Sequence, residues 1–532
     1  MTDTLLIGLD GATFRLLDPL MADGVMPFLR GFIRRGVRAS LTSTINPVTP
    51  PAWTTVMTGR SPGQHGVFDF VRADERGGEV YFTLYDARDI GCETIWSMAS
   101  RQERRIISLN FPMMFPHPGI NGYIVPGLTS WRHLKLGMRP PDLHEQLKEL
   151  PGLDFREMAW DFEQGKKVVF GIEPDQFASW VEFHIRREQH WFTVAKHLME
   201  HDPCELTAVL WDGPDKLSHI CWRFLDPAYL PASPTLWEQH IRDLCVEYFR
   251  RLDGYIAELV TLAGPDAKTI IVSDHGFGPS TEELHINTWL HERGYLTWRA
   301  PKSGEEAASA SWMRRLKSNF VLLEWQHTKA YARTSSSNGI YIRQSKTPGD
   351  GGVGAAEYEA FRDNLIRELH TITHPITGEP IVTRVWKREE AFPGPRMLEA
   401  PDLTLVLRDF GFISIRDHSP ALQLRDEVSG THYPDGIFLA AGAGIRRNVA
   451  LPPLAIQDVA PAVLHAAGLE VPRDLEGRVP IEIFDRGSDE WRDVRIGMPS
   501  AAYAQVGAPD VPEDAAGQAA IFERLKSLGY LE

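Results

Sequence analysis

Acidic and histidine side chains recur at the points where apolar stretches of the sequence stop. Asp10 ends the run LLIGLD, and Asp274 and His275 follow KTIIVS. Asp215 and His219 lie in PDKLSH, shortly after the apolar stretch ELTAVLW. Carboxylates combined with imidazoles suit zinc or a similar divalent cation, and such a site needs no thiolate. The residue types therefore indicate metal chemistry.

The spacing within each pair limits how its two members could share an ion. Asp215 and His219 are four residues apart, so on a helix both would lie on one face. Asp274 and His275 are adjacent, and adjacent side chains point to opposite faces of a regular strand. We therefore expect them just beyond the strand end, where Gly276 permits an unusual turn.

Two further side chains complete the candidate set. His432 lies in GTHYPDG, within a predicted loop at 426–434, and Thr49 begins TPPAWTT. The two prolines fix a turn at a predicted strand-to-helix junction, where a hydroxyl is a candidate nucleophile. Two divalent ions a few ångströms apart would lower the pKa of this hydroxyl, activate water and neutralise charge growing at phosphorus.

Each feature also has an ordinary structural explanation. The Asp-Gly step at Asp10 is compatible with a simple turn, and Thr49 with a helix-capping hydroxyl. The acid–histidine pairs could be solvated pairs worth a few tenths of a kcal/mol, and His432 an isolated histidine. The 15 tryptophans fit core packing better than a binding platform. Taken one at a time, the residues leave these alternatives open.

The elements that must position these residues alternate between apolar strands and amphipathic helices. Such alternation predicts an α/β fold with a mostly parallel central sheet sandwiched by helices, whose ligands bind at the carboxyl ends of the strands. Strands are predicted at 5–10, 105–110, 205–211, 268–273, 401–407 and 436–441. Helices are predicted at 26–36, 179–200, 240–261, 355–369, 458–467 and 519–528, and a solvated loop at 300–318.

The same pass along the chain predicts its division into regions. A catalytic core would take residues 1–134 and 205–487, the second part carrying a smaller insertion at about 301–400. Residues 135–204, rich in Trp, Phe, Glu and Lys, would form an inserted helical cap. Residues 488–532 would form an acidic tail that ends in a helix.

Composition narrows the classes of partner. The 532 residues are 43% apolar and 24% charged, as in ordinary globular proteins, and the formal charge is −15. A negative surface argues against a nucleic-acid polymer but not against a small phosphorylated substrate at a metal site. The four cysteines include no CxxC pair, and we read no signal peptide or membrane span, so a reducing, cytoplasmic location is expected.

The order of all these motifs resembles the alkaline phosphatase superfamily. More narrowly, it resembles the type I phosphodiesterase/nucleotide pyrophosphatase branch, in its prokaryotic predicted phosphohydrolase/phosphomutase form. The resemblance covers nearly the whole chain, and the combination is specific although no single string is. The matching strings after the first acid are TPPAWTTVMTG, SLNFPMMFP, PDKLSH, SDHGFGP, HINTWLHERGYL, APDLTLVL, GTHYPDGIF and LKSLGYLE.

The resemblance implies a site with two divalent ions. Thr49 would be the nucleophile and would form a phosphothreonine intermediate. Family members usually carry zinc, and some mutase relatives use manganese. One ion would be held by Asp10, Thr49, Asp274 and His275, and the other by Asp215, His219 and His432.

The sequence departs from better-known family members after the nucleophile. Their Phe-Pro-Asn supplies an Asn that donates a hydrogen bond to the phosphoryl group, whereas Pro50-Pro51-Ala52 stands here. Candidate replacement donors are the Ala52 backbone N–H and the side chains of Asn110 and Lys216. Asp212 lies near Asp215 and is a candidate to orient the ligands from behind. The sulfatase signature CxPSR is absent.

These features predict a two-metal phosphohydrolase, with a small phosphodiester of nucleotide-like kind as the leading substrate class. A phosphomutase, phosphotransferase or phosphomonoesterase at the same site is the alternative within enzymes. An inactive relative that binds a phosphorylated ligand is the alternative outside them, and the presence of all seven expected ligands argues against it.

Overall fold

A nine-stranded sheet forms the centre of the computed structural model, which describes residues 2–76, 79–117, 119–162, 174–299, 323–347, 349–500 and 514–531. Its order is β16-β2-β15-β8-β1-β7-β5-β6, with β17 beside β2, and every pairing is parallel except those of β15. The strands are β1 (Thr4–Leu9), β2 (Val37–Thr42), β5 (Ile106–Leu109), β6 (Gly122–Val125), β7 (Leu206–Trp211), β8 (Lys268–Val272), β15 (Asp435–Gly442), β16 (Val449–Ala450) and β17 (Leu454–Ala455). The predicted mostly parallel α/β sheet is confirmed.

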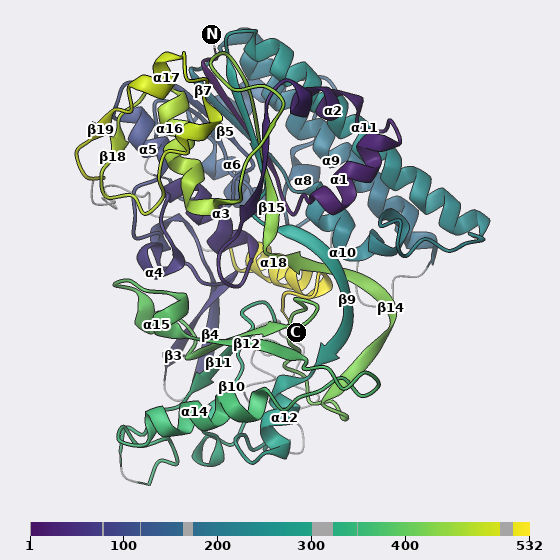
Figure 1. The fold of residues 1–532 in the computed structure, drawn as a ribbon, viewed down its shortest axis with the longest axis vertical. Coiled ribbons are helices and arrows are strands. Elements are labelled where there is room, and N and C mark those ends of the chain that lie inside the picture. Colours follow the sequence, from purple (N-terminus) through teal and green to yellow (C-terminus); the bar gives the residue numbers. More distant parts are fainter. Residues whose placement is uncertain are drawn as a thin grey trace.

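Helices cover both faces of this sheet (Figure 1). Alternate side chains of β1 enter two different cores, Leu5, Ile7 and Leu9 on one face and Leu6 on the other. The first core takes side chains from α1 (Phe14–Ala22), α2 (Pro27–Arg34), α6 (Trp131–Gly137), α7 (Leu143–Leu147), α8 (Phe155–Met158), α9 (Pro174–His201), α10 (Gly213–Leu225) and α11 (Leu236–Ala263). The second takes them from α3 (Thr49–Thr58), α5 (Ile95–Ser100) and α16 (Val459–Ala466).

A second, smaller sheet lies below the first in the view of Figure 1. Its order is β10-β11-β13-β12, and it shares a core with α12 (Ile286–Glu292) and α14 (Tyr358–Leu369). The predicted strand at 401–407 belongs here, as β13, and pairs antiparallel with both neighbours. The strands are β10 (Ala330–Tyr331), β11 (Gly339–Ile342), β12 (Val382–Lys387) and β13 (Leu403–Leu407).

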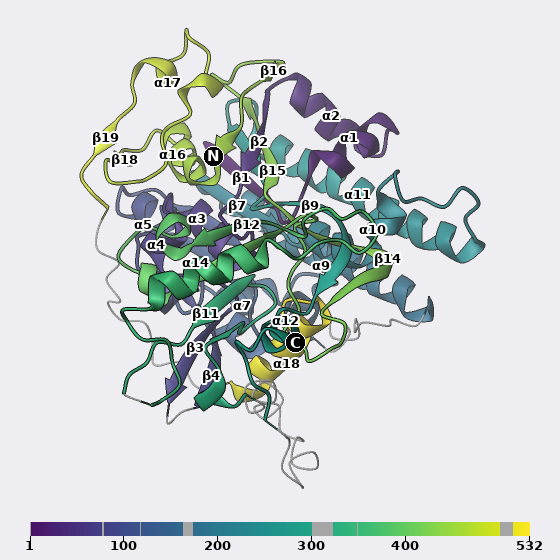
Figure 2. The same ribbon diagram turned by 60° about the horizontal axis from the view of Figure 1, so that its bottom comes forward.

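A long two-stranded ribbon runs from the central sheet towards the small one (Figures 1 and 2). It pairs β9 (Gly276–Leu284) antiparallel with β14 (Leu422–Tyr433). His432 therefore lies on a strand, and the prediction of a loop over 426–434 is wrong. The reason is that β9 begins directly after His275 and offers β14 a partner that is remote in sequence.

The remaining described elements are short. They include α18 (Ala515–Ser527), the hairpin of β3 (Val71–Arg76) and β4 (Glu79–Leu84), and the pair β18 (Val471–Pro472) and β19 (Ile496–Gly497). Single turns of helix complete the described part of the chain: α4 (Pro62–His65), α15 (Arg388–Ala391), α17 (Asp489–Arg492) and the 3-10 turns 87–89, 325–327, 397–399, 456–458 and 481–483. The loop predicted at 300–318 falls within 300–322, outside the described residues. Helix α9 packs against α11 and β7, and the division into core and cap stays a prediction.

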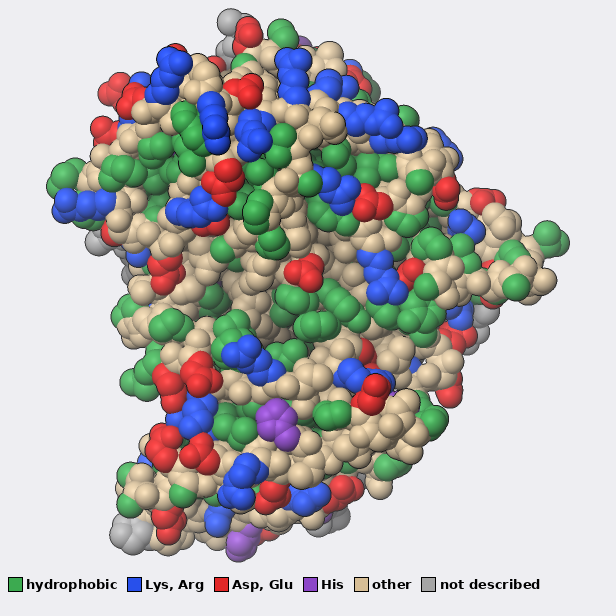
Figure 3. Space-filling view, in the orientation of Figure 1, with side chains coloured by type: hydrophobic (Ala, Val, Ile, Leu, Met, Phe, Trp, Pro, Cys, Tyr) green, Lys and Arg blue, Asp and Glu red, His purple; other side chains and the backbone are tan. Residues whose placement is uncertain are grey.

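The surface mixes charges of both signs. On the face in Figure 3, basic and acidic side chains are interspersed, and hydrophobic ones gather across the middle. Within the described part of the chain, we find no helix that combines the length and apolar character needed to cross a bilayer.

Candidate active site

The seven candidate side chains sit where the central strands end, and all are buried. Asp10 follows β1, and Asp274 and His275 connect β8 to β9. Because β1, β7 and β8 are parallel neighbours, their carboxyl ends meet at one edge of the sheet. The other members come from the helices and the ribbon at this edge: Thr49 from α3, Asp215 and His219 from α10, and His432 from β14.

Asp10, Asp274 and His275 form the first group, with candidate ligand atoms within 4.8 Å of one another. His275 Nε2 lies 3.5 Å from Asp10 Oδ1 and 3.3 Å from Asp274 Oδ2. Each carboxylate has its other oxygen held, Asp10 Oδ2 by the Trp53 indole N–H and Asp274 Oδ1 by the Gly11 N–H, both at 3.2 Å. The three inward atoms form no hydrogen bond within the described residues.

The surroundings prepare this group to bind a cation. The His275 Nδ1–H donates to the Gly276 carbonyl oxygen at 3.0 Å, which leaves the Nε2 lone pair directed at the carboxylates. Gly11 turns the chain with a φ of 67°, and a Cβ there would come within 2.8 Å of the Phe277 ring. Buried polar atoms are normally paired, so three converging unpaired ones mark a cation site.

Thr49 lies on the same helix as Trp53, whose indole contacts the first group. It is the first residue of α3 and is buried, and its hydroxyl oxygen also has no hydrogen-bond partner among the described residues. Trp53, which contacts Asp10, lies one turn later on the same face of the helix. We therefore expect the Thr49 hydroxyl to face the same carboxylates.

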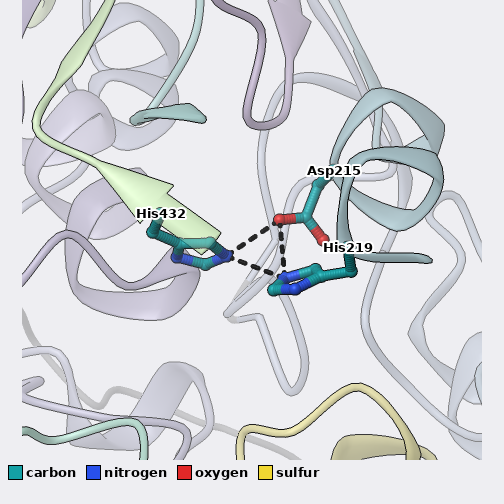
Figure 4. Close-up of side chains that lie close together, drawn as sticks. All are labelled: Asp215, His219 and His432. Carbon is teal, nitrogen blue, oxygen red and sulfur yellow. Dashed lines mark hydrogen bonds and ion pairs between the residues drawn. The ribbon is translucent and has the colours of Figure 1, made fainter. Parts of the chain in front are cut away.

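Asp215, His219 and His432 form the second group, drawn in Figure 4. Asp215 Oδ1 lies 3.0 Å from His432 Nε2 and 3.5 Å from His219 Nε2, and the two Nε2 atoms are 3.0 Å apart. The His432 Nδ1–H donates to the Pro47 carbonyl oxygen at 2.7 Å, so its Nε2 is an acceptor. The helix brings Asp215 and His219 to one face, as their spacing predicts, and the strand brings His432 opposite them.

The two groups are neighbours. His275 Nε2 of the first lies 3.9 Å from Asp215 Oδ1 of the second, and the rings of His275 and His432 stack with centroids 3.6 Å apart. Two ions held here would be close enough to act on one phosphoryl group.

Burial shifts the pKa values of the candidate ligands. Burial, and then the carboxylates Asp274 and Asp215, raises the pKa of Asp10 well above its usual range. Burial also raises the pKa of Asp274 and lowers that of His432 to about 4, so the imidazole is neutral at pH 7. In the first group, carboxylates that resist ionisation fit a divalent cation, which reverses this penalty. In the second group burial favours the protonated acid, but the neighbouring Lys216 holds the pKa of Asp215 well below its usual range, so a charged carboxylate stands beside the neutral His432 ring. The residues present therefore fit two metal ions.

The sequence model of the family "Type I phosphodiesterase / nucleotide pyrophosphatase" matches residues 4–435. The chain belongs to this family. No curated protein matches it significantly.

Solved structures show the same fold at low identity. Phosphonoacetate hydrolase from Sinorhizobium meliloti 1021, solved with phosphonoformate, is 17% identical with a TM-score of 0.52, over 88% of this chain and 96% of that one. Human ectonucleotide pyrophosphatase / phosphodiesterase 5 is 16% identical with a TM-score of 0.50, over 91% and 100%. The fold of this phosphodiesterase-family chain is therefore alkaline-phosphatase-like.

The three candidate phosphoryl donors have different surroundings in this family member. The Ala52 N–H donates to the Val48 carbonyl oxygen at 3.0 Å and is engaged within α3, whose first turn has prolines without N–H groups. Asn110, at the end of β5, donates to the Leu210 carbonyl oxygen at 2.9 Å. Lys216 is buried against the second group, with Nζ 2.6 Å from Asp215 Oδ2.

The sequence does not predict two of the contacts at this site. Trp53 was assigned to core packing, although its spacing from Thr49 in TPPAW places both on one helix face. Tyr530, in the final motif LKSLGYLE, places its hydroxyl 2.8 Å from His219 Nε2. Nothing local in the sequence indicates that this residue reaches the site.

A cavity of about 460 Å³ opens beside His219. It lies between α10, β14 and the chain that follows α18. Its lining includes the aromatic residues Trp237 and Phe412 and the cations Arg223 and Arg425. Arg223 pairs with Glu427, and Arg425 Nη1 lies 3.5 Å from Glu283 Oε2, so the wall is polar but balanced in charge.

Proposed function

We propose that this member of the phosphodiesterase family is a two-metal-ion phosphohydrolase that cleaves a small phosphodiester through a phosphothreonine intermediate at Thr49. One observation carries the proposal. The inward atoms of Asp10, Asp274 and His275 converge, buried and without hydrogen-bond partners among the described residues, beside a second group of ligand type. The Thr49 hydroxyl is likewise buried and without a partner among those residues. Burying such unpaired polar atoms costs folding free energy unless they bind cations and a reacting group.

The assignments of ligands follow from the two groups. Asp10, Thr49, Asp274 and His275 would hold one ion, and the second group the other. Oxygen and imidazole donors without thiolate suit zinc, with manganese as the alternative. When bound, the two ions supply Lewis acidity and neutralise the charge that grows at phosphorus.

The residues of the chain would carry out two displacement steps. The Thr49 oxygen attacks phosphorus, its proton passes to solvent, and the leaving alcohol departs with the electron pair of the broken P–O bond. Water then attacks the phosphothreonine, and Thr49 regains its proton. Trp53 and Gly11 hold the carboxylates in place throughout, and Lys216 is the candidate side chain to bind a phosphoryl oxygen.

The cavity beside His219 is a candidate site for a small organic leaving group. Its aromatic residues could pack against a base or another flat group, which favours a nucleotide-like diester. A nucleic-acid polymer is not expected, because the net charge is −15. The cytoplasmic location inferred from the sequence remains a prediction.

The test combines metal counting with substrate comparison. We expect two divalent ions per chain by elemental analysis, and hydrolysis of an aryl phosphodiester that exceeds hydrolysis of the matching monoester. Chelation should abolish the activity, and readdition of zinc or manganese should restore it. Two ions with a preference for the monoester would favour a phosphatase or mutase. Absence of both metal and turnover would contradict the proposal and point to a binding protein.

A further inference from the structure

Tyr530, in the segment that follows α18, reaches the second ligand group. Its side chain is fully buried, and its hydroxyl oxygen lies 2.8 Å from His219 Nε2 and 3.1 Å from His432 Nε2. The same oxygen is 3.2 Å from Asp215 Oδ1 and 3.0 Å from Asp215 Oδ2. One phenol oxygen thus touches all three candidate ligands of this group.

The four atoms have the shape of a tetrahedral metal site. The three edges that meet at the Tyr530 oxygen measure 2.8, 3.1 and 3.2 Å, the last to Asp215 Oδ1. The three edges among Asp215 Oδ1, His219 Nε2 and His432 Nε2 measure 3.0, 3.0 and 3.5 Å. Zinc at its usual distance from four ligands would space them about 3.3 Å apart.

Without an ion, hydrogen bonds hold these atoms together. The single phenol proton faces the His219 and His432 Nε2 atoms and a carboxylate. His432 Nε2 cannot donate, because the proton of its neutral ring is on Nδ1, bonded to the Pro47 carbonyl oxygen. The His219 Nε2–H can donate to His432 Nε2 at 3.0 Å, and the phenol can donate to Asp215. Lys216 Nζ donates to Asp215 Oδ2 at 2.6 Å. A cation at the centre of the four atoms would replace the hydrogen bonds among them by direct contacts to all four.

We propose that the Tyr530 phenol oxygen is the fourth ligand of the ion held by Asp215, His219 and His432. This inference rests on the metal site of the proposed function. It adds a residue from the segment that follows α18 to that site, so that ion occupancy and docking of this segment become linked.

The chain around Tyr530 holds the oxygen in position. Gly529 adopts a φ of 82°, which lets the chain turn after α18. The Tyr530 N–H donates to the Leu525 carbonyl oxygen at 3.0 Å, and its own carbonyl accepts the Ser336 N–H at 3.1 Å. Its ring packs against Phe70, with centroids 4.4 Å apart. A ligand fixed on both sides by the backbone loses little entropy when it binds an ion.

The consequence is a second site with four protein ligands at rest. Catalytic zinc sites keep a position for water or substrate, or expand to five ligands. A substrate oxygen would therefore bind this ion by adding a fifth ligand or by displacing the phenol. The residues that follow α18 also line the cavity beside His219, so displacement would begin at the cavity wall.

The test compares Tyr530→Phe with Tyr255→Phe in the full-length protein. Phenylalanine keeps the ring packing and removes only the oxygen. The control residue lies on α11, where its hydroxyl donates to Gln189 Oε1 at 2.8 Å, away from the site. We expect Tyr530→Phe to lower the affinity for one of the two zinc ions by about tenfold or more, measured by chelator competition. The control variant should bind both ions with the wild-type affinity.

A spectroscopic readout separates ligation from packing. Loading both variants with Co²⁺ reports the donor set through its visible absorption, and we expect only Tyr530→Phe to change that spectrum. Tyr530→His, which offers a nitrogen donor, should regain part of the lost affinity. If Tyr530→Phe does not fold, Tyr530→Ala takes its place. A normal Co²⁺ spectrum and normal zinc affinity in Tyr530→Ala would overturn the proposal. Loss of one ion in Tyr530→Ala, with recovery in Tyr530→His, would support it.

The remaining outcomes are also decisive. Two ions of unchanged affinity with an unchanged Co²⁺ spectrum in Tyr530→Phe would overturn the proposal, even if turnover fell, because the hydroxyl would then act on substrate. These readouts measure metal and not hydrolysis. An inactive wild-type protein that binds two ions would count against the proposed function only, whereas a wild-type protein that binds none would overturn both.

Discussion

Several side chains at this site use one polar atom for a protein hydrogen bond and direct the other into the site. In both carboxylates of the first group one oxygen accepts a protein hydrogen bond and the other points inward, and His275 and His432 each commit Nδ1 to a carbonyl oxygen. The committed atoms fix orientation, and the free atoms are left for ions and substrate. In the first group this pattern distinguishes a binding site from buried polar residues that satisfy one another, whereas in the second group the inward atoms also contact one another and the Tyr530 hydroxyl.

Replacement of Thr49, the proposed nucleophile, gives the sharpest prediction at this scale. Thr49→Ala should lower phosphodiester turnover by about 10³-fold or more, because the covalent step loses its attacking oxygen. Bound metal should stay close to two ions per chain. Thr58→Ala, which removes another buried hydroxyl of α3 bonded to the Thr54 carbonyl oxygen, is the matched control and should keep its activity. Steady-state kinetics with elemental analysis checks this, and substantial activity in Thr49→Ala would remove the assignment.

At the scale of elements, an ion pair and a hydrogen bond from α9 fix the position of the N-terminal end of α10. Arg187 of α9 is fully buried and pairs with Asp212, the residue before α10, and Glu188 accepts the Gly213 N–H at 2.7 Å. Although burial favours the protonated acid, the Arg187 guanidinium holds the pKa of Asp212 below its usual value. Because α10 carries Asp215 and His219, this contact sets where the second group lies.

Arg187→Met should therefore destabilise the fold. Removal of one partner leaves the Asp212 charge buried and unpaired, which costs about 3–5 kcal/mol. The neighbouring Arg186 makes a partly exposed pair with Glu157 at 3.1 Å, and Arg186→Met should cost less than about 1 kcal/mol. Urea unfolding of both variants measures the difference, and equal effects would show that the buried pair does not anchor α10.

At the scale of the whole molecule, Asp69 joins the segment before the β3–β4 hairpin to the smaller sheet. It accepts hydrogen bonds from the Thr334 and Ser336 hydroxyls, at 2.6 and 2.5 Å, in the segment between β10 and β11. It lies just before β3, and the Phe70 N–H donates to it at 2.7 Å. Burial raises the pKa of Asp69 to about 6, although these hydrogen bonds lower it in part.

This raised pKa predicts a pH dependence of stability. The folded state binds the Asp69 proton more tightly than the unfolded state, so the contribution is present below about pH 4 and is lost as pH rises through about 6. Asp69→Asn has no such titration. The stability of the variant relative to wild type should therefore rise by about 2–3 kcal/mol between pH 4 and pH 7. Urea unfolding at both pH values measures this, and a constant difference would contradict it.

Local sequence patterns were enough to predict much of the fold and of the candidate site. The apolar strands that end in Asp10 and Asp274, the helical spacing of Asp215 and His219, and the alternation of strands with helices all lie within short windows of sequence. Burial and backbone geometry act on such windows directly, so they predicted the parallel sheet and the edge at which the candidate residues gather. The order of the motifs then identified the family.

Tertiary structure decided the contacts between remote segments. His432 faces His219 across 213 residues because β14 pairs with β9, and Tyr530 reaches His219 across 311 residues because α18 docks beside the site. The strand at 403–407 joins a second sheet for the same reason, through partners that no local pattern specifies. Periodicity records which face of an element is apolar but not which distant element covers it, so these contacts became visible only in the folded chain.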